Sequence, residues 1–250
     1  MNHSISFQNQ VKPRCSVIMP VKNELQNIRK TIMQLNSVLD FSYECLIVVD
    51  DLYDPTISEV EKLELEMSQI KLLYNNHRPG FVGAIRSGIS ESQAPVVVIM
   101  MADGSDDPVT IPRLISHIES GVTIASASRY SDGGSQQGGG LIKKYLSKLA
   151  GTTFKYFTGC GTSDVTNNFK AYDKNFLIKN PIESIKGFEL GLEMVSKAVV
   201  QNLIIKEVGT FWSDRTAGTS KFLLVEEIPR YLKWYLYGIF KQRFKNSEKN

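Results

Sequence analysis

A short apolar run that ends in an acidic loop constrains the fold of this 250-residue chain more than any other feature. Residues 96–101 read Val-Val-Val-Ile-Met-Met, an unbroken apolar run that suits a strand covered on both faces inside a parallel sheet. The loop that follows carries Asp103, Asp106 and Asp107. Ligands of open α/β sheets bind at the carboxyl ends of the strands, so this loop is the first candidate for a functional site.

Strand-like and helix-like segments alternate around this run. Further strands are expected at 15–19, 43–49 and 71–74, and helices at 24–39, at 58–67 and after the glycine-punctuated stretch 75–88. This alternation indicates βαβ units and therefore an α/β fold, a mostly parallel sheet flanked by helices. Because right-handed crossovers bring the carboxyl ends of parallel strands to one edge, residues 20–24, 50–51 and 103–107 should line one crevice.

Two details of the first strand and helix follow from local rules. Pro20 is expected to end the strand, because proline cannot donate to a sheet ladder. Asn23 and Gln26 have the spacing of a capping box, which predicts the start of the helix.

The second half of the chain is less regular. Helices are expected at 112–119, 141–157, 188–201 and 229–244, and strands at 122–125 and 203–208. Residues 131–140 contain five glycines, which lose much backbone entropy on ordering, so a mobile loop is expected there.

Composition limits the class of protein. The length fits one large or two small α/β domains, and a net charge of +3 is too small to argue for a nucleic-acid partner. The three cysteines lie far apart without metal-ligand spacing, and buried reduced thiols favour the cytoplasm. No signal peptide opens the chain, and no apolar run reaches the roughly 18 residues that span a bilayer.

The acidic loop has two interpretations. Three carboxylates in five residues repel one another, and a hard divalent cation such as Mg²⁺ or Mn²⁺ among them would relieve the repulsion. Alternatively the loop is a solvated turn in which Asp107 caps the helix that Pro108 starts. The loop alone leaves both open.

The order of seven motifs resembles the family 2 glycosyltransferases of the GT-A fold, and among them the dolichyl-phosphate mannose synthase and polyprenyl-phosphate glycosyltransferase branch. The motifs are Val-Ile-Met-Pro-Val-Lys-Asn-Glu (17–24), Val-Val-Asp-Asp (48–51), the glycine-punctuated 80–88, Ala-Asp-Gly-Ser-Asp-Asp-Pro (102–108), Ser-Arg-Tyr (128–130), Asp-Val-Thr-Asn-Asn-Phe-Lys (164–170) and Asp-Arg-Thr-Ala-Gly-Thr-Ser-Lys (214–221). The resemblance implies a flexible N-terminus over 1–14, a GT-A catalytic domain over 15–222, and an amphipathic helix and tail over 223–250.

For the donor, the resemblance implies a nucleotide-diphosphate-sugar of the GDP-mannose or UDP-glucose type. The residues implied to bind it are Pro20, Val21, Glu24, Asp50, Arg86, Ala102 and Asp103. Asp103 aligns with the last aspartate of the family's Asp-x-Asp metal motif, whereas Met101 occupies the position of the first. Asp106 or Asp107 would then supply the missing charge, and Mg²⁺ or Mn²⁺ would neutralise the diphosphate leaving group.

For the acceptor, the resemblance implies a polyprenyl phosphate or similar lipid phosphate, to which the sugar is transferred with inversion. The residues implied to hold phosphate are Arg129, Lys143, Arg215, Ser220 and Lys221, since guanidinium and ammonium groups suit phosphate oxygens. Asp164 is expected to orient its cationic neighbours. An ionised phosphate needs no general base, because no proton has to leave it.

Two alternatives stay open. A cytosolic transferase that acts on a sugar hydroxyl in surface-polysaccharide or lipopolysaccharide assembly would need Asp164, Glu189 or Glu193 as a base. A domain that binds nucleotide sugar without turnover would also be compatible with Met101.

The predicted helix at 229–244 interleaves aromatic residues with arginine and lysine. It would be about 24 Å long at 1.5 Å per residue, which is too short to cross a bilayer. We expect it to lie flat on the cytoplasmic face of a membrane, or else to pack on the catalytic domain or on a second subunit of a homodimer.

Overall fold

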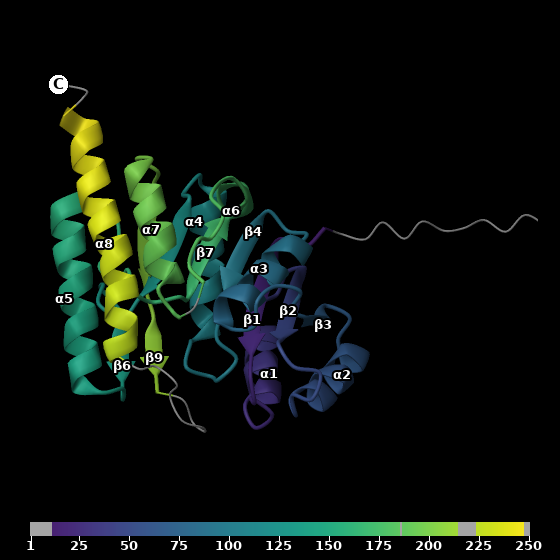
Figure 1. The fold of residues 1–250 in the computed structure, drawn as a ribbon. Coiled ribbons are helices and arrows are strands. Elements are labelled where there is room, and N and C mark those ends of the chain that lie inside the picture. Colours follow the sequence, from purple (N-terminus) through teal and green to yellow (C-terminus); the bar gives the residue numbers. More distant parts are fainter. Residues whose placement is uncertain (1–11, 186, 215–223, 248–250) are drawn as a thin grey trace, which may run out of the picture.

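Apolar strands build a central sheet with two buried faces in the computed structural model, which describes residues 12–185, 187–214 and 224–247 (Figure 1). The elements, in chain order, are β1 (Cys15–Val21), α1 (Ile28–Val38), β2 (Tyr43–Val49), α2 (Ile57–Glu66), β3 (Ile70–Tyr74), α3 (Phe81–Glu91), β4 (Val96–Ile99), η1 (Pro108–Thr110), α4 (Ile111–Glu119), β5 (Ile124–Ser128), β6 (Ser135–Gln137), α5 (Leu141–Thr158), β7 (Lys170–Asp173), α6 (Lys174–Lys179), α7 (Leu190–Val200), β8 (Ile205–Gly209), β9 (Phe211–Ser213) and α8 (Leu224–Ser247).

The main sheet has seven strands in the order β3-β2-β1-β4-β7-β5-β8. Every neighbouring pair is parallel except those that β7 makes with β4 and with β5. The expected α/β class with a mostly parallel sheet is confirmed. Because β2, β1 and β4 are neighbours, the loops that follow them meet at one edge of the sheet.

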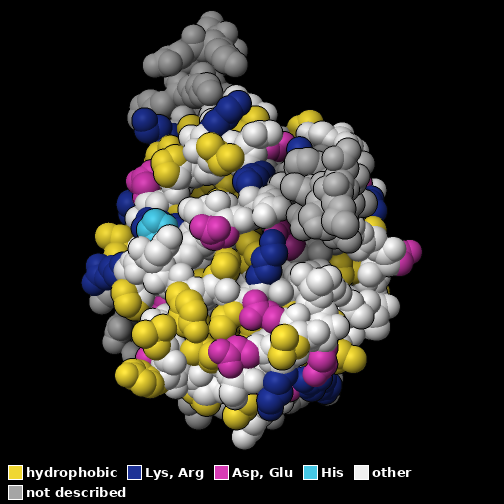
Figure 2. All heavy atoms as spheres, turned by 90° about the vertical axis from the view of Figure 1, so that its right-hand side faces the viewer, with side chains coloured by type: hydrophobic (Ala, Val, Ile, Leu, Met, Phe, Trp, Pro, Cys, Tyr) yellow, Lys and Arg dark blue, Asp and Glu magenta, His cyan; other side chains and the backbone are white. Residues whose placement is uncertain are grey.

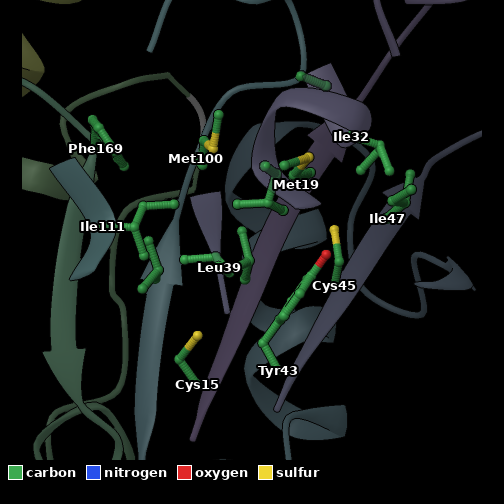
Figure 3. Close-up of a cluster of buried hydrophobic side chains, with 14 of the residues drawn as sticks. Cys15, Met19, Ile32, Leu39, Tyr43, Cys45, Ile47, Met100, Ile111 and Phe169 are labelled. Carbon is green, nitrogen blue, oxygen red and sulfur yellow. The ribbon is translucent and has the colours of Figure 1, made fainter. Parts of the chain in front are cut away.

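Alternate residues of each strand face opposite layers of helices. Cys15, Val17 and Met19 of β1 belong to one core with α1, α2 and α4, which Figure 3 shows in part. Ile18 belongs to the opposite core, together with α3, α7 and part of α8. Both faces of the sheet are therefore closed to water, as expected for strands that read as continuous apolar runs.

The first strand and helix differ from expectation at their junction. β1 continues through Pro20 to Val21, which is possible because β4 pairs with β1 only as far as Ile18 and leaves one side free. The capping box at Asn23 is wrong, since that residue adopts a left-handed φ of 61° and α1 begins later. The backbone N–H of Asn23 instead donates to Asp54 Oδ2 at 2.9 Å.

The glycine-rich segment 131–140 is not the mobile loop that its composition predicts. Its β6 strand pairs in parallel with β9, a strand of the distant segment that follows β8. The N–H of Asp214 also donates to the carbonyl of Gln137 at 2.9 Å. Long-range pairing thus offsets the backbone entropy of the glycines, and a local pattern cannot reveal such a partner.

The C-terminal helix α8 packs along α7 and α5, which lie beside it in Figure 1. Trp234 is only 3% exposed, and Tyr231, Tyr235 and Tyr237 pack against the same core. The aromatic face of α8 therefore packs against the core of the domain. This is the arrangement given as the alternative to lying flat on a membrane. In the three described ranges of the chain, every helix is too short or too polar to cross a bilayer.

The surface agrees with the small net charge. Figure 2 shows the end of the molecule near α2 and β3, where acidic and basic side chains lie interspersed among the described residues. The described residues on this face therefore form no extended area of one sign.

Gly88 provides a test of the α3 packing. A Cβ at this position would overlap Cγ2 of Ile18, so Gly88→Ala should destabilise the fold by about 1–3 kcal/mol despite the better helix propensity of alanine. Urea unfolding measures the change. Ser90→Ala, on the exposed side of the same helix, should stay within about 0.5 kcal/mol. Equal stability of the two variants would show that β1 and α3 are not in tight contact.

Candidate active site

The acidic loop after β4 folds back on itself and buries two of its carboxylates. Asp103 and Asp106 are 3% and 5% exposed. Asp103 Oδ1 accepts from the N–H of Ser105 at 3.1 Å, and Asp106 Oδ2 accepts from the N–H of Met101 at 2.9 Å. Gly104 allows the turn because its φ of 76° lies in the left-handed region. The sequence thus places two acidic groups together at the carboxyl end of a buried strand.

The burial of Asp106 beside Asp103 changes the ionisation of Asp106. Burial raises the pKa of Asp106 to about 7, and the charge of Asp103 contributes to the shift, while Arg129 and Lys170 oppose it. A divalent cation beside Asp106 would favour its ionised form. The donor set, two aspartate oxygens, suits Mg²⁺ or Mn²⁺.

Asp107 does not join this pair. Its Oδ1 accepts from the N–H of Val109 at 3.1 Å and caps η1, with Pro108 at the first position. The capping alternative therefore describes Asp107, and its part in metal binding stays a prediction. Among the described residues, no three His, Cys, Asp or Glu side chains converge on one point. A cation held by Asp103 and Asp106 would complete its coordination with phosphate oxygens and water, as Mg²⁺ commonly does.

A buried ion pair lies beside β7 and β5, the two strands that follow β4 in the sheet order. Arg129, just after β5, donates from Nε and Nη2 to the two oxygens of Asp164 at 2.8 Å each. Asp164 is fully buried. Burial raises the pKa of Asp164, but the charge and hydrogen bonds of Arg129, together with the charge of Lys170, outweigh burial and lower it, so the carboxyl stays ionised. This geometry fits the expected orienting part of Asp164 and leaves its oxygens engaged.

Lys170 is a buried cation in this site to which the sequence reasoning gave no part. Its Nζ donates to the carbonyl oxygens of Asp164, at 3.2 Å, and of Asn167. Burial lowers the pKa of Lys170 to about 8, although the charge of Asp164 opposes the shift. A lysine that opens a strand reads as a surface residue in sequence. Only the antiparallel insertion of β7 between β4 and β5 buries it.

The acidic loop and the ion pair are held together through β9. The N–H of Ser213 donates to the carbonyl of Ser105 at 3.1 Å, and Trp212 forms a backbone bridge with Asp106. The guanidinium carbon of Arg129 lies 5.9 Å from the ring centre of Trp212. A cavity of about 210 Å³ opens beside the loop, between α1 and β9. The carboxylates of the acidic loop and the guanidinium of Arg129 therefore both lie next to β9.

The residues expected to bind a nucleotide lie mostly along the same edge. Pro20 and Val21 end β1, Asp50 follows β2, and Ala102 and Asp103 follow β4. Asp50 accepts from Asn75 Nδ2 at 2.7 Å and from the N–H of Gly80 at 2.8 Å, which ties β2 to the start of α3.

Glu24 and Arg86 have local partners. Glu24 Oε2 accepts from Asn27 Nδ2 at 2.7 Å, just before α1. Arg86 Nη2 donates to the carbonyl oxygens of Ile182 and of Ser184, and its binding of the nucleotide stays a prediction. Arg86 thereby anchors the segment that precedes α7.

The expected phosphate-binding residues divide into two groups. Arg215, Ser220 and Lys221 lie outside the described residues. Lys143 lies half-buried in the first turn of α5. One turn later, Ser147 accepts from Arg129 Nη2 at 3.1 Å, so this end of α5 borders the ion pair.

One expected base is committed elsewhere. Glu193 is fully buried, lies 2.7 Å from Lys197 Nζ and accepts from the N–H groups of Glu183 and Ser184. It is a structural group of α7.

The groups described above define what the carboxyl edge of the sheet can bind. It can hold a cation-bound diphosphate at Asp103 and Asp106, and an anionic partner at Arg129.

Asp164→Asn tests the buried ion pair. The substitution leaves Arg129 and Lys170 without their counter-charge, so it should destabilise the fold by about 3–5 kcal/mol in urea unfolding. The exposed pair of Arg14 with Glu119, with side chains 43% and 41% accessible, offers a matched control. Glu119→Gln should cost about 1 kcal/mol or less. A similar small effect at Asp164 would mean that water screens the pair.

The chain is similar to known proteins over most of its length. The polyprenol monophosphomannose synthase of Mycolicibacterium smegmatis is 26% identical over 214 residues, which cover 83% of this chain and 80% of the relative. The dolichol-phosphate mannosyltransferase of Pyrococcus furiosus is 28% identical over 234 residues, or 88% of this chain. This chain spans 64% of the length of the Pyrococcus protein.

Solved structures share the fold. Glucosyl-3-phosphoglycerate synthase from Mycobacterium tuberculosis with Mn²⁺, UDP-glucose and phosphoglyceric acid has a TM-score of 0.67 at 15% identity, over 91% of this chain and 80% of that chain. The same enzyme with Mg²⁺ and UDP has a TM-score of 0.66 at 14% identity, over 91% and 79%.

A family model matches the larger part of the chain. The model described as Glycosyl transferase family 2 matches residues 16–180, which is more than half of the chain. The matched region contains β1 to β7 and thus both the acidic loop and the buried ion pair. The protein therefore belongs to glycosyl transferase family 2.

Proposed function

We propose that this protein transfers a sugar, with inversion, from a nucleotide-diphosphate-sugar of the GDP-mannose or UDP-glucose type to a polyprenyl phosphate. The observation that carries the proposal is the juxtaposition of the buried Asp103 and Asp106 with Arg129, since Trp212 forms a backbone bridge with Asp106 and its ring centre lies 5.9 Å from the guanidinium carbon of Arg129. The two carboxylates suit a cation-bound diphosphate, and the guanidinium of Arg129 suits an anionic acceptor. The names of the two relatives point to a polyprenyl-type phosphate as that acceptor.

On the donor side, Pro20, Val21, Glu24 and Asp50 form the floor for the nucleotide, and Asp103 with Asp106 holds the metal. Structures of the same fold contain Mn²⁺ or Mg²⁺ with a uridine nucleotide, which supports either ion as the cofactor. When bound, such an ion would neutralise charge on the diphosphate leaving group. Asp106 supplies the second carboxylate that Met101 cannot.

On the acceptor side, Arg129 is the central group. Asp164 engages its Nε and Nη2, and within the described part of the chain no hydrogen bond involves Nη1. We propose that this edge binds a phosphate oxygen of the acceptor. We propose that the phosphate site is completed by Lys143, Arg215, Ser220 and Lys221. We also propose that the catalytic domain covers residues 15–222 and is followed by a C-terminal helix and tail over 223–250.

The alternative of a sugar hydroxyl as acceptor has less support. It needs a general base. Asp164 and Glu193 are fully buried in ion pairs, which leaves Glu189, only 3% exposed, as the remaining expected base. Release of nucleoside diphosphate separates these possibilities. Release that depends on polyprenyl phosphate supports the proposal, release with sugar acceptors supports the alternative, and binding without release indicates a non-catalytic domain.

Asp103→Ala tests the metal assignment. Release of nucleoside diphosphate in the presence of Mn²⁺ and polyprenyl phosphate should fall by about two to three orders of magnitude, because the metal contributes several kcal/mol to the transition state. Asp107→Asn is the matched control, since asparagine also caps helices and the rate should change by less than about threefold. Equal losses in both variants would return Asp107 to the metal site.

We also propose that the protein contacts the cytoplasmic face of a membrane through α5. The outward side of this helix exposes Leu141, Ile142, Tyr145 and Leu149, which are 72%, 69%, 71% and 61% accessible. The helix contains four lysines and no acidic residue. A lysine-rich helix with an unpaired apolar side suits an anionic lipid surface. The aromatic face of α8 points inward, so α5 takes the place first expected for 229–244.

Co-sedimentation with vesicles tests this surface. Ile142→Ser combined with Leu149→Ser should weaken binding to phosphatidylglycerol vesicles at least about tenfold, since both side chains would otherwise enter the interface. Leu65→Ser is a control on α2, where Leu65 is 91% exposed. Unchanged vesicle binding with a loss of dimers in size-exclusion chromatography would assign α5 to a homodimer instead.

A further inference from the structure

The turn between β1 and α1 contains a residue in a conformation that side chains rarely adopt. Asn23 has a φ of 61°, which lies in the left-handed region. Its side chain is exposed, so packing of that side chain does not impose the conformation. An unfavourable backbone conformation of this kind persists only where the surrounding structure holds it. The contacts that hold Asn23 are therefore informative.

Two buried residues of the loop between β2 and α2 provide these contacts. Asp54 and Thr56 are 7% and 0% exposed. Asp54 Oδ2 accepts from the N–H of Asn23 at 2.9 Å, and Thr56 Oγ1 accepts from the N–H of Glu24 at 2.9 Å. The Thr56 hydroxyl in turn donates to Asp54 Oδ1 at 2.6 Å. Asp54 and Thr56, which we call the clamp, thus bind two consecutive amide groups of the turn.

The polar groups of the clamp serve the turn more than their own helix. Thr56 stands at the N-cap position of α2, yet its hydroxyl does not cap that helix and accepts from Glu24 instead. In the described residues, the partners of the Asp54 carboxylate are neutral donors, namely Asn23 and the N–H and hydroxyl of Thr56. Hydrogen bonds to a carboxylate are shorter and stronger than those between neutral groups. This buried carboxylate therefore fixes backbone.

The peptide groups of Glu24 are held on both sides. Its N–H is bound by Thr56, and its carbonyl accepts from the N–H groups of Asn27 and Ile28 at 2.9 Å each, just before and at the start of α1. Its side chain accepts from Asn27 Nδ2 at 2.7 Å. The clamp therefore sets the position of Glu24 relative to the end of β1, where Val21 lies.

The loop that carries the clamp also carries Asp50. It starts with Asp50 directly after β2 and continues to the clamp at residues 54 and 56. Within it, the N–H of Asp54 donates to the carbonyl of Asp51 at 3.1 Å, and Asp51 Oδ1 accepts from the N–H of Tyr53 at 2.9 Å. The loop therefore couples the position of Asp50 to that of the turn after β1.

We propose that Asp54 and Thr56 are positioning residues that shape the floor of the nucleotide site. By holding the turn at Asn23, they fix Glu24 relative to Asp50, although the two lie on different loops. This inference rests on the proposed function and deepens it, because it names residues that act on the donor site through the backbone. The acidic loop after β4 has no part in the clamp, so its loss should weaken nucleotide binding more than it slows transfer.

Calorimetric titration tests the clamp. The full-length protein, Thr56→Val and Thr56→Ser are titrated in MnCl₂ with GDP and with UDP. For the diphosphate that binds, Thr56→Val should raise the Kd about tenfold, because valine matches threonine in shape but cannot accept from the N–H of Glu24. Thr56→Ser keeps the hydroxyl, so its Kd should stay within about threefold. In transfer assays, Thr56→Val should raise the donor KM about tenfold and change kcat by less than about threefold.

Ser16→Ala is the matched control for lost stability. Ser16 lies at the amino end of the same strand β1, is fully buried, and donates to Glu44 Oε1 at 2.6 Å. Loss of this hydroxyl should lower the melting temperature about as much as Thr56→Val does, yet leave the Kd within about twofold. A general loss of stability therefore cannot produce the expected difference.

A second pair of variants tests the inference at an exposed side chain. Asn23→Ala disfavours the left-handed conformation, whereas Asn23→Gly permits it. The Kd for the diphosphate should rise about fivefold in Asn23→Ala and stay within about twofold in Asn23→Gly. This pair carries the test if thermal melting shows that Thr56→Val is misfolded.

Three outcomes would overturn the inference. An unchanged Kd in Thr56→Val with a lower melting temperature would make the clamp purely structural. An equal rise of the Kd in Ser16→Ala would trace the effect to global stability, and equal rises in Asn23→Ala and Asn23→Gly would assign it to the Asn23 side chain. Clamp-dependent nucleotide binding without transfer to polyprenyl phosphate would instead refute the proposed function and leave the clamp standing.

Discussion

The ion pair of Arg129 with Asp164 is the interaction on which the candidate site depends. Asp164 is fully buried and binds the guanidinium through both oxygens. Removing either partner would therefore leave the charge of the other buried and uncompensated. Lys170 adds a second cation to the carbonyl of the same aspartate. The three residues come from the end of β5, the loop before β7 and the start of β7. A single buried charge cluster thus fixes how the two halves of the sheet meet.

The antiparallel strand β7 explains why this cluster can exist. In an all-parallel sheet, the residues at the carboxyl ends would be loop residues of similar exposure. β7 runs in the opposite direction between β4 and β5, so its first residue, Lys170, lies where its neighbours end. It therefore delivers a cation from the amino end of a strand to the edge where the acidic loop of β4 lies. Opposite charges meet there without a long loop between them.

Much of the fold was predictable from the sequence, because periodicity and turn residues act locally. The strands at 43–49 and the alternation around β4 were read correctly, and the acidic loop was placed at the right edge. What failed depends on partners distant in sequence. The left-handed Asn23 relies on Asp54, and the ordering of 131–140 relies on β9. The burial of Lys170 has the same cause, since no local pattern reports which elements will pack together.

The ribbon formed by β6 and β9 has a consequence for how the site works. It is a separate sheet of only two strands, and such a pair has little stability of its own. One of its strands touches the acidic loop through Ser213 and Ser105, and the other belongs to the glycine-rich segment. Its amide hydrogens should therefore exchange with solvent long before those of the central sheet, and ligands that engage the loop should slow that exchange. The two-stranded ladder of β6 and β9 would then report, through its exchange rate, whether the donor is bound.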